Sequence, residues 1–201
     1  TVVTYNTLNF GNSEGKLEDG SNRAVNFLIA TDADIICLQE SGSQAAYYEQ
    51  FTQAGYECAN IKEFTICSRL PVLSYDTLAL EGGRAHCMRA YVQADEDTIM
   101  LINTHLLSNH ISGDVKDAYI EAIRQHESDS LRKGVRPVVE LLANAQPLRA
   151  MQVDAIKAVI DEWLPRPVIL CGDFNDTPIS YAHRVLTTDL SSAFPESGNG
   201  L

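Results

Sequence analysis

A carboxylate and a carboxamide follow an apolar run of strand length at residues 167–171, in the segment Gly172-Asp173-Phe174-Asn175. Such a run predicts a buried strand, so Asp173 and Asn175 stand where the hydrophobic pattern stops. An Asp supplies charge or a base, an Asn amide donates to a phosphate oxygen, and a glycine permits close backbone approach. The combination suits a phosphate and metal site, and the simpler alternative is an Asx-rich turn.

Three other apolar segments also end on polar groups. Residues 2–6 end on Asn6, residues 34–40 on Glu40, and residues 99–105 on His105. Each segment is short and rich in β-forming side chains, which predicts a strand. Four predicted strands therefore end in Asn, Glu, His and Asp-x-Asn, and this combination favours one shared site.

These motifs, in this order, resemble the endonuclease/exonuclease/phosphatase superfamily, which includes deoxyribonuclease I-like nucleases, inositol polyphosphate 5-phosphatases and neutral sphingomyelinases. The resemblance implies an α/β fold, a four-layer α/β/β/α sandwich of two mixed sheets flanked by helices, in which strand ends converge on one cleft. The segment pattern itself favours a two-sheet sandwich over a doubly wound sheet. The matching stretches span nearly the whole chain: Thr4-Tyr5-Asn6, Leu38-Gln39-Glu40, Ser68-Arg69-Leu70-Pro71, Asn103-Thr104-His105 and Gly172-Asp173-Phe174-Asn175.

One element of the superfamily pattern is missing from these 201 residues. Members carry a late Asp and a Ser-Asp-His motif near the C-terminus, whereas this chain stops at Leu201, soon after Asn175. The nearest string, Glu127-Ser128-Asp129-Ser130, lacks the histidine. We therefore expect a single domain over 1–201 that is truncated at its C-terminus, or a protein that has lost this histidine.

The composition is that of a globular protein, with 45% hydrophobic and 21% charged residues. No apolar run approaches the roughly 20 residues that span a bilayer. The net charge of -12 disfavours a processive nuclease, because duplex DNA is normally held by a basic surface. A phosphoester that is small or derived from a lipid head group is the favoured substrate, and a nucleic acid is the alternative.

The cysteines bear on the compartment. Cys37, Cys67, Cys87 and Cys171 lie inside apolar runs, where we interpret them as small buried hydrophobic residues. We therefore expect no disulfide framework and a soluble domain with reduced thiols. A leader or anchor that precedes Thr1 is compatible with this sequence.

Periodicity predicts helices over residues 22–30 and 148–164. A further helix should carry Tyr47, Tyr48 and Phe51 as an aromatic core stripe, in preference to a base-stacking platform. The polar stretch 109–134 should be a partly helical excursion over the site or a mobile flap. Strands expected as a meander, with a turn at 81–84, cover 56–60, 64–67, 72–80 and 87–94.

The resemblance, read with residue chemistry, implies a role for each strand end. Glu40 is the expected principal ligand of a divalent ion, and Asn6 holds the ion or its water through the amide oxygen. Mg²⁺ is the expected ion, with Mn²⁺ as a substitute, because the donors are hard oxygens and zinc-type Cys/His spacing is absent. The resemblance implies that Asp173 orients or deprotonates the attacking water and that Asn175 binds a phosphoryl oxygen.

Other candidates carry an open alternative. His105 contacts the phosphate or donates a proton, unless it is a structural histidine. Arg69 contacts phosphate or anchors a turn through a salt bridge. Asp176 is expected to cap the turn that follows it, because Thr177-Pro178 is expected to begin a helix. Four further basic residues are unranked candidates: Arg84, His86, Arg89 and His110.

The chemistry that these residues imply is metal-assisted, in-line hydrolysis of a phosphoester by activated water. A covalent intermediate is disfavoured because no Ser or Cys has a recognisable base beside it. Three classes of function stay open at this point. They are a Mg²⁺-dependent phosphodiesterase or phosphatase, a nuclease, and a non-catalytic binding module that lost the terminal histidine.

Overall fold

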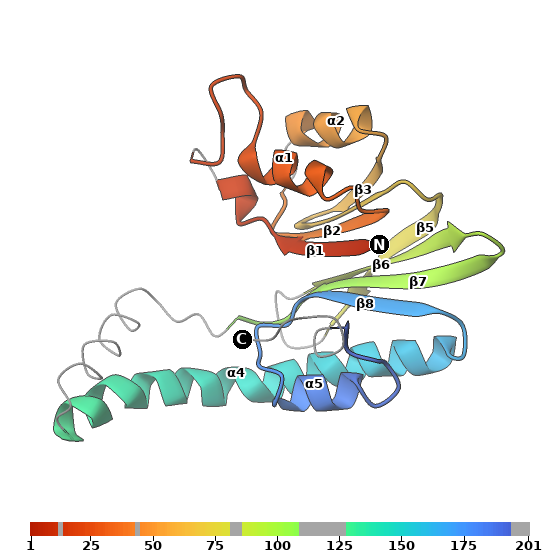
Figure 1. Cartoon of the computed structure of the whole chain (residues 1–201). Coiled ribbons are helices and arrows are strands. Elements are labelled where there is room, and N and C mark those ends of the chain that lie inside the picture. The colour runs from red at the N-terminus through yellow and green to blue at the C-terminus, as the bar shows by residue number, and fades with distance from the viewer. Residues whose placement is uncertain (12–13, 43–44, 81–85, 109–127, 194–201) are drawn as a thin grey trace. The chain divides into compact units, whose positions relative to one another are not determined.

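The computed structural model describes residues 1–11, 14–42, 45–80, 86–108 and 128–193 (Figure 1). The chain forms two compact units. The first comprises Thr1–Leu80, Ala85–His105 and Ala158–Phe174, and the second comprises Glu81–Arg84, Leu106–Lys157 and Asn175–Leu201. Each unit is treated by itself below, and the single domain expected from the sequence stays a prediction.

The first sheet has four strands in the order β1-β2-β4-β3. Strands β1 and β2 are parallel, and the other pairs are antiparallel. Every residue of β2 and β4 is buried, as expected for central strands covered on both faces. The strands are β1 (Val2–Asn6), β2 (Ile35–Gln39), β3 (Glu57–Ile61) and β4 (Phe64–Ser68).

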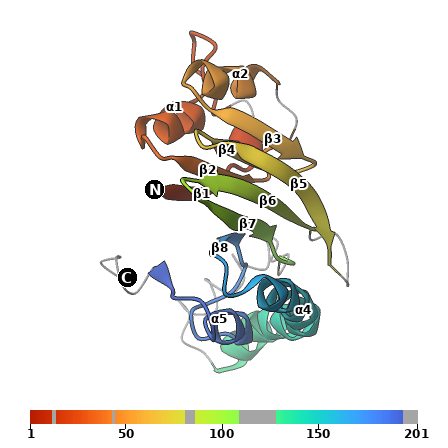
Figure 2. The same cartoon turned by 90° about the vertical axis from the view of Figure 1, so that its right-hand side faces the viewer.

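Helices α1 (Arg23–Ala30) and α2 (Ala45–Gln53) cover one face of this sheet (Figure 2). The side chain of Asn22 caps α1 by accepting from two backbone N–H groups, so the predicted start of this helix is confirmed. Tyr47 and Phe51 point into the core, where Tyr47 packs on Phe10 with ring centroids 4.8 Å apart. The aromatic stripe of α2 is therefore a core stripe, as predicted.

The second sheet has the order β5-β6-β7-β8, with β7 and β8 parallel. Its apolar face meets the first sheet in a core that includes Phe64, Ile66, Met88 and Leu101. The predicted α/β class of two mixed sheets flanked by helices is confirmed. The four strands of the predicted meander are present, but they form two separate pairs, β3 with β4 in the first sheet and β5 with β6 in the second, so the meander itself is wrong. The strands are β5 (Val72–Ala79), β6 (His86–Ala94), β7 (Asp97–His105) and β8 (Val168–Asp173).

Helix α4 (Ser128–Trp163) is longer than the predicted helix at 148–164 and includes the last part of the polar stretch 109–134. Its final residues belong to the first unit, where the Trp163 ring packs on Tyr91 of β6 with centroids 4.9 Å apart. None of the described helices is long and apolar enough to cross a membrane. The predicted turn at 81–84, Arg84, His110, the side chain of His86 and residues 109–127 lie outside the described residues.

Helix α5 (Tyr181–Leu186) begins later than predicted, because its N-cap is Ser180, whose hydroxyl accepts from His183 N–H. Asp176 therefore does not cap a helix. Its carboxylate accepts from the N–H of Thr177 and also lies beside a buried arginine, as described below. The prediction failed because the Asp-Thr-Pro string fits a turn as well as a helix start.

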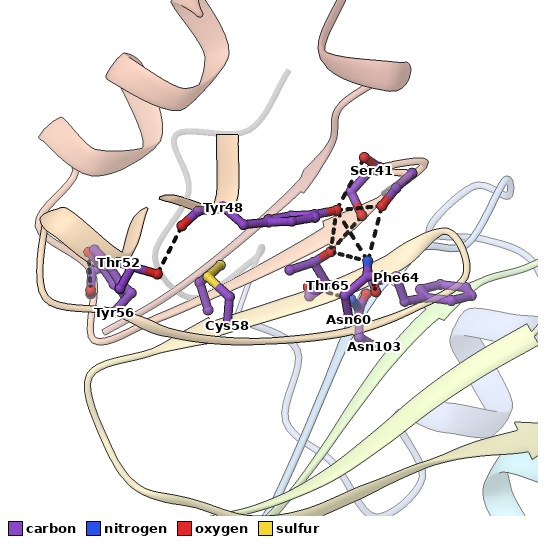
Figure 3. The surroundings of a disulfide bond; sticks show 12 residues. Ser41, Tyr48, Thr52, Tyr56, Cys58, Asn60, Phe64, Thr65 and Asn103 are labelled. Atoms are coloured by element: carbon purple, nitrogen blue, oxygen red, sulfur yellow. Dashed lines mark hydrogen bonds between the residues drawn. A yellow bond between two sulfur atoms is a disulfide. The ribbon is translucent and has the colours of Figure 1, made fainter. Parts of the chain in front are cut away.

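The interpretation of Cys67 as a free thiol is wrong. Cys58 and Cys67 stand directly opposite each other on β3 and β4 and form a disulfide (Figure 3). The pairing depends on the register of two strands, which the local sequence around either cysteine does not reveal. Cys37, Cys87 and Cys171 are free, as predicted.

Candidate active site

Four predicted site residues stand at the ends of four strands in the first unit. The parallel register places Asn6 beside Gln39, so Glu40 follows directly at the same end of β2. The other parallel pair places His105 opposite Asp173. Strand β1 also contacts β8, so both parallel pairs end together.

The four side chains form one cluster. The Asn6 Nδ2 donates to Glu40 Oε1 at 2.9 Å and to Asp173 Oδ2 at 3.0 Å. The His105 Nε2 lies 3.7 Å and 4.0 Å from the same two oxygens. The Glu40 and Asp173 side chains are 28% and 33% exposed, so both carboxylates are within reach of a ligand.

Gly172 lets β8 approach β7 at this point. Its φ is 141°, and a Cβ there would lie 1.9 Å from the carbonyl oxygen of Thr104. Any side chain would force the strand ends apart, so glycine sets the spacing of His105 and Asp173. The sequence indicated that this glycine permits close backbone approach, and the neighbour that requires it is strand β7.

A left-handed turn follows Asn6. Leu8, Asn9, Phe10 and Gly11 all have positive φ, between 45° and 71°. A non-glycine residue in this region costs about 1–2 kcal/mol. The turn is held to the Glu40 loop because Asn9 N–H donates to the Glu40 carbonyl at 2.9 Å.

This turn also orients the amide of Asn6. Leu8 N–H donates to Asn6 Oδ1 at 3.0 Å, so the amide nitrogen faces the two carboxylates. Glu40 itself has a φ of 51°. Strained backbone therefore lies on both sides of the cluster, which is common at functional sites.

Two buried amides support the cluster from behind. Gln39 Nε2 donates to Asn103 Oδ1 at 2.6 Å, and Asn103 Nδ2 donates to the Leu38 carbonyl at 2.9 Å. Both side chains are almost fully buried and join the two sheets next to Glu40 and His105. Sequence reasoning assigned them no role, although each lies inside a motif that it had identified.

A second polar group fixes the loop that follows Glu40 (Figure 3). Ser41 and Thr65 share a hydrogen bond of 2.7 Å between their hydroxyl groups. Asn60 Nδ2 donates to the Gly42 carbonyl at 3.1 Å, and the Tyr48 hydroxyl donates to the same carbonyl. The backbone after Glu40 therefore has little freedom to move.

The chemistry of the cluster fits a hard divalent cation. Two partly exposed carboxylates converge on Nδ2 of Asn6, and carboxylate oxygens are donors that such ions prefer. Among the residues that the structure describes, no group of three or more His, Cys, Asp or Glu side chains is arranged to hold a metal ion.

Arg69 lies at the other end of the first sheet. The residue before it, Ser68, pairs with Ile35 at the start of β2, whereas Glu40 follows the end of that strand. Its guanidinium pairs with Asp32 and stacks on the Tyr56 ring, 4.5 Å from the centroid. The structure therefore shows the salt bridge that anchors a turn, and Arg69 has no place in the cluster.

Arg89, one of the unranked candidates, is also engaged elsewhere. Its Nε donates to Asp76 Oδ1 at 2.9 Å across strands β5 and β6.

Asn175 belongs to the second unit, where its Nδ2 donates to the Leu106 carbonyl at 2.9 Å. In sequence it stands two residues after Asp173.

A sequence profile of the Endonuclease/Exonuclease/phosphatase family matches residues 3–200. The chain belongs to this family. The resemblance inferred from the strand-end motifs is therefore confirmed. No sequence among curated proteins matches this chain.

Solved structures of family members share the fold. A humanized D. rerio TDP2 with 14 mutations aligns with a TM-score of 0.63 and 15% identity, over 95% of this chain and 71% of that chain. The human Nocturnin catalytic domain aligns with a TM-score of 0.64 and 15% identity, over 96% and 71%. ANGEL2 aligns with a TM-score of 0.52 and 20% identity, over 92% and 56%. At these identities the likeness shows the fold alone.

Proposed function

We propose that this protein is a metal-dependent phosphoester hydrolase that uses water as its nucleophile. The single observation that carries the proposal is the contact of one amide, Asn6, with the carboxylates of Glu40 and Asp173, with His105 Nε2 within 4.0 Å of both. A carboxylate pair with an imidazole beside it supplies a ligand, a base and a proton donor in one place. Family membership supports the same chemistry.

Glu40 and Asn6 would hold the divalent ion, with Mg²⁺ as the expected ion and Mn²⁺ as a substitute. Such an ion neutralises phosphate charge and lowers the pKa of water. Binding through Asn6 Oδ1 requires the amide to rotate, because Nδ2 and not Oδ1 faces the two carboxylates. The rotation would break the hydrogen bond from Leu8 N–H to Oδ1, which is a testable rearrangement.

The remaining groups act on water and phosphate. Asp173 is proposed to orient and deprotonate the attacking water, and His105 Nε2 to donate to a phosphoryl oxygen. Asn175 is proposed to bind phosphate, and this role rests on its position two residues after Asp173 in the family motif. Water attacks in line, so no covalent intermediate is needed.

A small phosphoester or a lipid head group is the proposed substrate. The net charge of -12 supports this choice over duplex nucleic acid. Solved relatives supply the competing case: D. rerio TDP2 was crystallised with a single-strand DNA product, and ANGEL2 is a 2',3'-cyclic phosphatase seen with adenosine-2',3'-vanadate. Nucleotide substrates therefore belong in any panel of test compounds.

The test measures hydrolysis of bis(p-nitrophenyl) phosphate and p-nitrophenyl phosphate with Mg²⁺, with Mn²⁺ and with EDTA. We expect turnover that EDTA abolishes. Glu40→Gln should weaken Mg²⁺ binding in calorimetric titration and leave the circular dichroism spectrum unchanged. Glu57→Gln, an exposed carboxylate at the far end of β3, is the matched control. Turnover that is insensitive to EDTA, or unchanged Mg²⁺ affinity in Glu40→Gln, would contradict the proposal.

A further inference from the structure

Arg149 of α4 is a buried charge, with 1% of its surface exposed. Arginine is almost never fully buried unless it is paired, because its charge loses hydration. Packing alone does not require a charged side chain at this position of α4. Its contacts within the second unit supply the reason.

The guanidinium joins two loops of this unit. Its Nη1 donates to the Leu107 carbonyl at 3.3 Å and to the Asn175 carbonyl at 2.6 Å. Its Nε lies 3.6 Å from Asp176 Oδ2, whose side chain is only 8% exposed. One cation therefore holds the backbone that follows β7 and the backbone that follows β8.

Neighbouring amides strengthen the same junction. Gln152, three residues along α4, accepts from Leu107 N–H at 3.1 Å through its Oε1. Asn175 Nδ2 donates to the Leu106 carbonyl at 2.9 Å, and Asn175 has a φ of 49°. The loops are thus tied to α4 and to each other at a residue with strained backbone.

Stability alone does not account for this arrangement. In the described part of the chain, Arg149 Nε and Nη2 and Gln152 Nε2 have no hydrogen-bond partner. An unsatisfied buried donor costs about 1–3 kcal/mol, and an apolar side chain of the same volume avoids that cost. Among the described residues, the polar contacts of the guanidinium are with the two loops, so its benefit is the fixed position of their backbone.

We propose that Arg149 is a positioning residue for the reaction, assisted by Gln152. This proposal rests on the proposed hydrolase function. Leu106 is bonded directly to His105, and Asn175 follows Asp173 by two residues, so backbone freedom in these loops is transmitted through the chain to both site residues. The guanidinium contacts both carbonyls through Nη1 and lies beside Asp176 through Nε, and lysine, with one nitrogen on a flexible stem, cannot reproduce both contacts in this rigid geometry.

The test compares kcat and KM for bis(p-nitrophenyl) phosphate in Arg149→Met, in Arg149→Lys and in the double variant Arg149→Met with Asp176→Asn. Because a misplacement of about 1 Å costs roughly 10²-fold in rate, we expect kcat to fall by roughly 10²-fold in Arg149→Met with KM within about threefold. Arg149→Lys should keep the charge and still lose roughly 10-fold in kcat.

The double variant separates positioning from stability. It removes both partners of the buried ion pair, so its thermal midpoint should return close to that of the wild type, while kcat stays low. Lys157→Met is the matched control, because it removes a Lys157–Asp189 ion pair of 2.8 Å from the same helix. Its kcat should match the wild type.

Two results would overturn the proposal. One is a kcat in Arg149→Met within twofold of the wild type per folded molecule, and the other is a double variant that recovers kcat together with stability. If Arg149→Met fails to fold, the double variant and Arg149→Lys decide the question. Absence of turnover in the wild type would instead contradict the proposed hydrolase function, and hydrogen exchange at Leu107 N–H in these variants would then show whether Arg149 fixes the loop.

Discussion

The loop after β2 and the loop after β8 follow the two carboxylates of the site, and they are held in different ways. The first, residues 40–42, is fixed by neutral hydroxyl and amide groups from α2, β3 and β4. The second, residues 175–176, is fixed by the buried charge of Arg149. Neutral hydrogen bonds contribute about 1 kcal/mol each, whereas losing one partner of a buried ion pair costs about 3–5 kcal/mol.

This difference teaches where each loop is vulnerable. Loss of one hydroxyl from the first loop leaves several other hydrogen bonds in place, so its failure should be gradual. The second loop depends mainly on Arg149, with one further hydrogen bond from Asn175 to the Leu106 carbonyl, so loss of Arg149 alone should make its failure abrupt. Variants in each region can test whether the two loops respond in these different ways.

The largest expected effect comes from the carboxylate before the second loop. Asp173→Asn keeps an oxygen that can accept from Asn6 but removes the base, so kcat should fall by roughly 10²-fold or more with KM changed less. Glu40→Gln should act mainly through metal affinity instead. Steady-state kinetics over a range of Mg²⁺ concentrations checks both, and a near wild-type kcat in Asp173→Asn would remove this residue from the chemistry.

Reduction of the Cys58–Cys67 disulfide should have the next largest effect, on stability. The bond joins residues nine apart, and closing a loop of this size is worth about 2–3 kcal/mol in the unfolded state. Urea unfolding with and without dithiothreitol measures the loss. The double variant Cys58→Ser with Cys67→Ser should be indifferent to dithiothreitol, and a wild type that is equally indifferent would contradict the bond.

Alkaline pH should destabilise the second sheet through Cys87, which lies on β6 opposite Thr104 of β7. Burial raises the pKa of the Cys87 thiol to about 12. Because the pKa of Cys87 is higher in the folded than in the unfolded protein, the stability that the neutral thiol contributes is fully present below the pKa of the unfolded state. This contribution is lost as pH rises towards 12. Between pH 8 and pH 10.5 the loss should be about 2 kcal/mol. Unfolding titrations of the wild type and of Cys87→Ala at both pH values isolate this contribution, and identical pH responses in the two proteins would refute it.

The smallest effect should come from Tyr48→Phe, at a residue of α2 that holds the first loop. The Tyr48 hydroxyl donates to the Gly42 carbonyl, which Asn60 also contacts, so its loss should cost about 1 kcal/mol and change kcat by less than threefold. Tyr75→Phe, on the exposed face of β5, is the control. A drop in kcat as large as that expected for Arg149→Met would abolish the distinction between gradual and abrupt failure.

The strand ends of the site could be predicted because a polar residue at the end of an apolar run of strand length is a local signal. Asn6, Glu40, His105 and Asp173 share this signal, and parallel register then brings them together. The same reasoning could not place Arg69, since its motif does not say which end of the sheet it occupies.

The supporting residues were beyond sequence reasoning for a different reason. Arg149 and Gln152 are polar positions on a predicted amphipathic helix, where the ordinary interpretation is a solvent-facing side chain. Their contacts are with loops far away in sequence. Cys58 likewise shows its partner only once the register of β3 and β4 is known. Features that depend on tertiary pairing leave no local pattern.

The parallel pairing of β7 with β8 has a consequence for synthesis of the chain. The hydrogen bond between Asn6 and Asp173 spans 167 residues. At about 5–20 residues per second, Asn6 leaves the ribosome on the order of ten seconds before Asp173 does. Strands β5 to β7 emerge early in that interval and can cover the first sheet, but the edge of β7 that pairs with β8 stays unpaired until β8 emerges, so this edge of the nascent protein has the greatest need of chaperone protection.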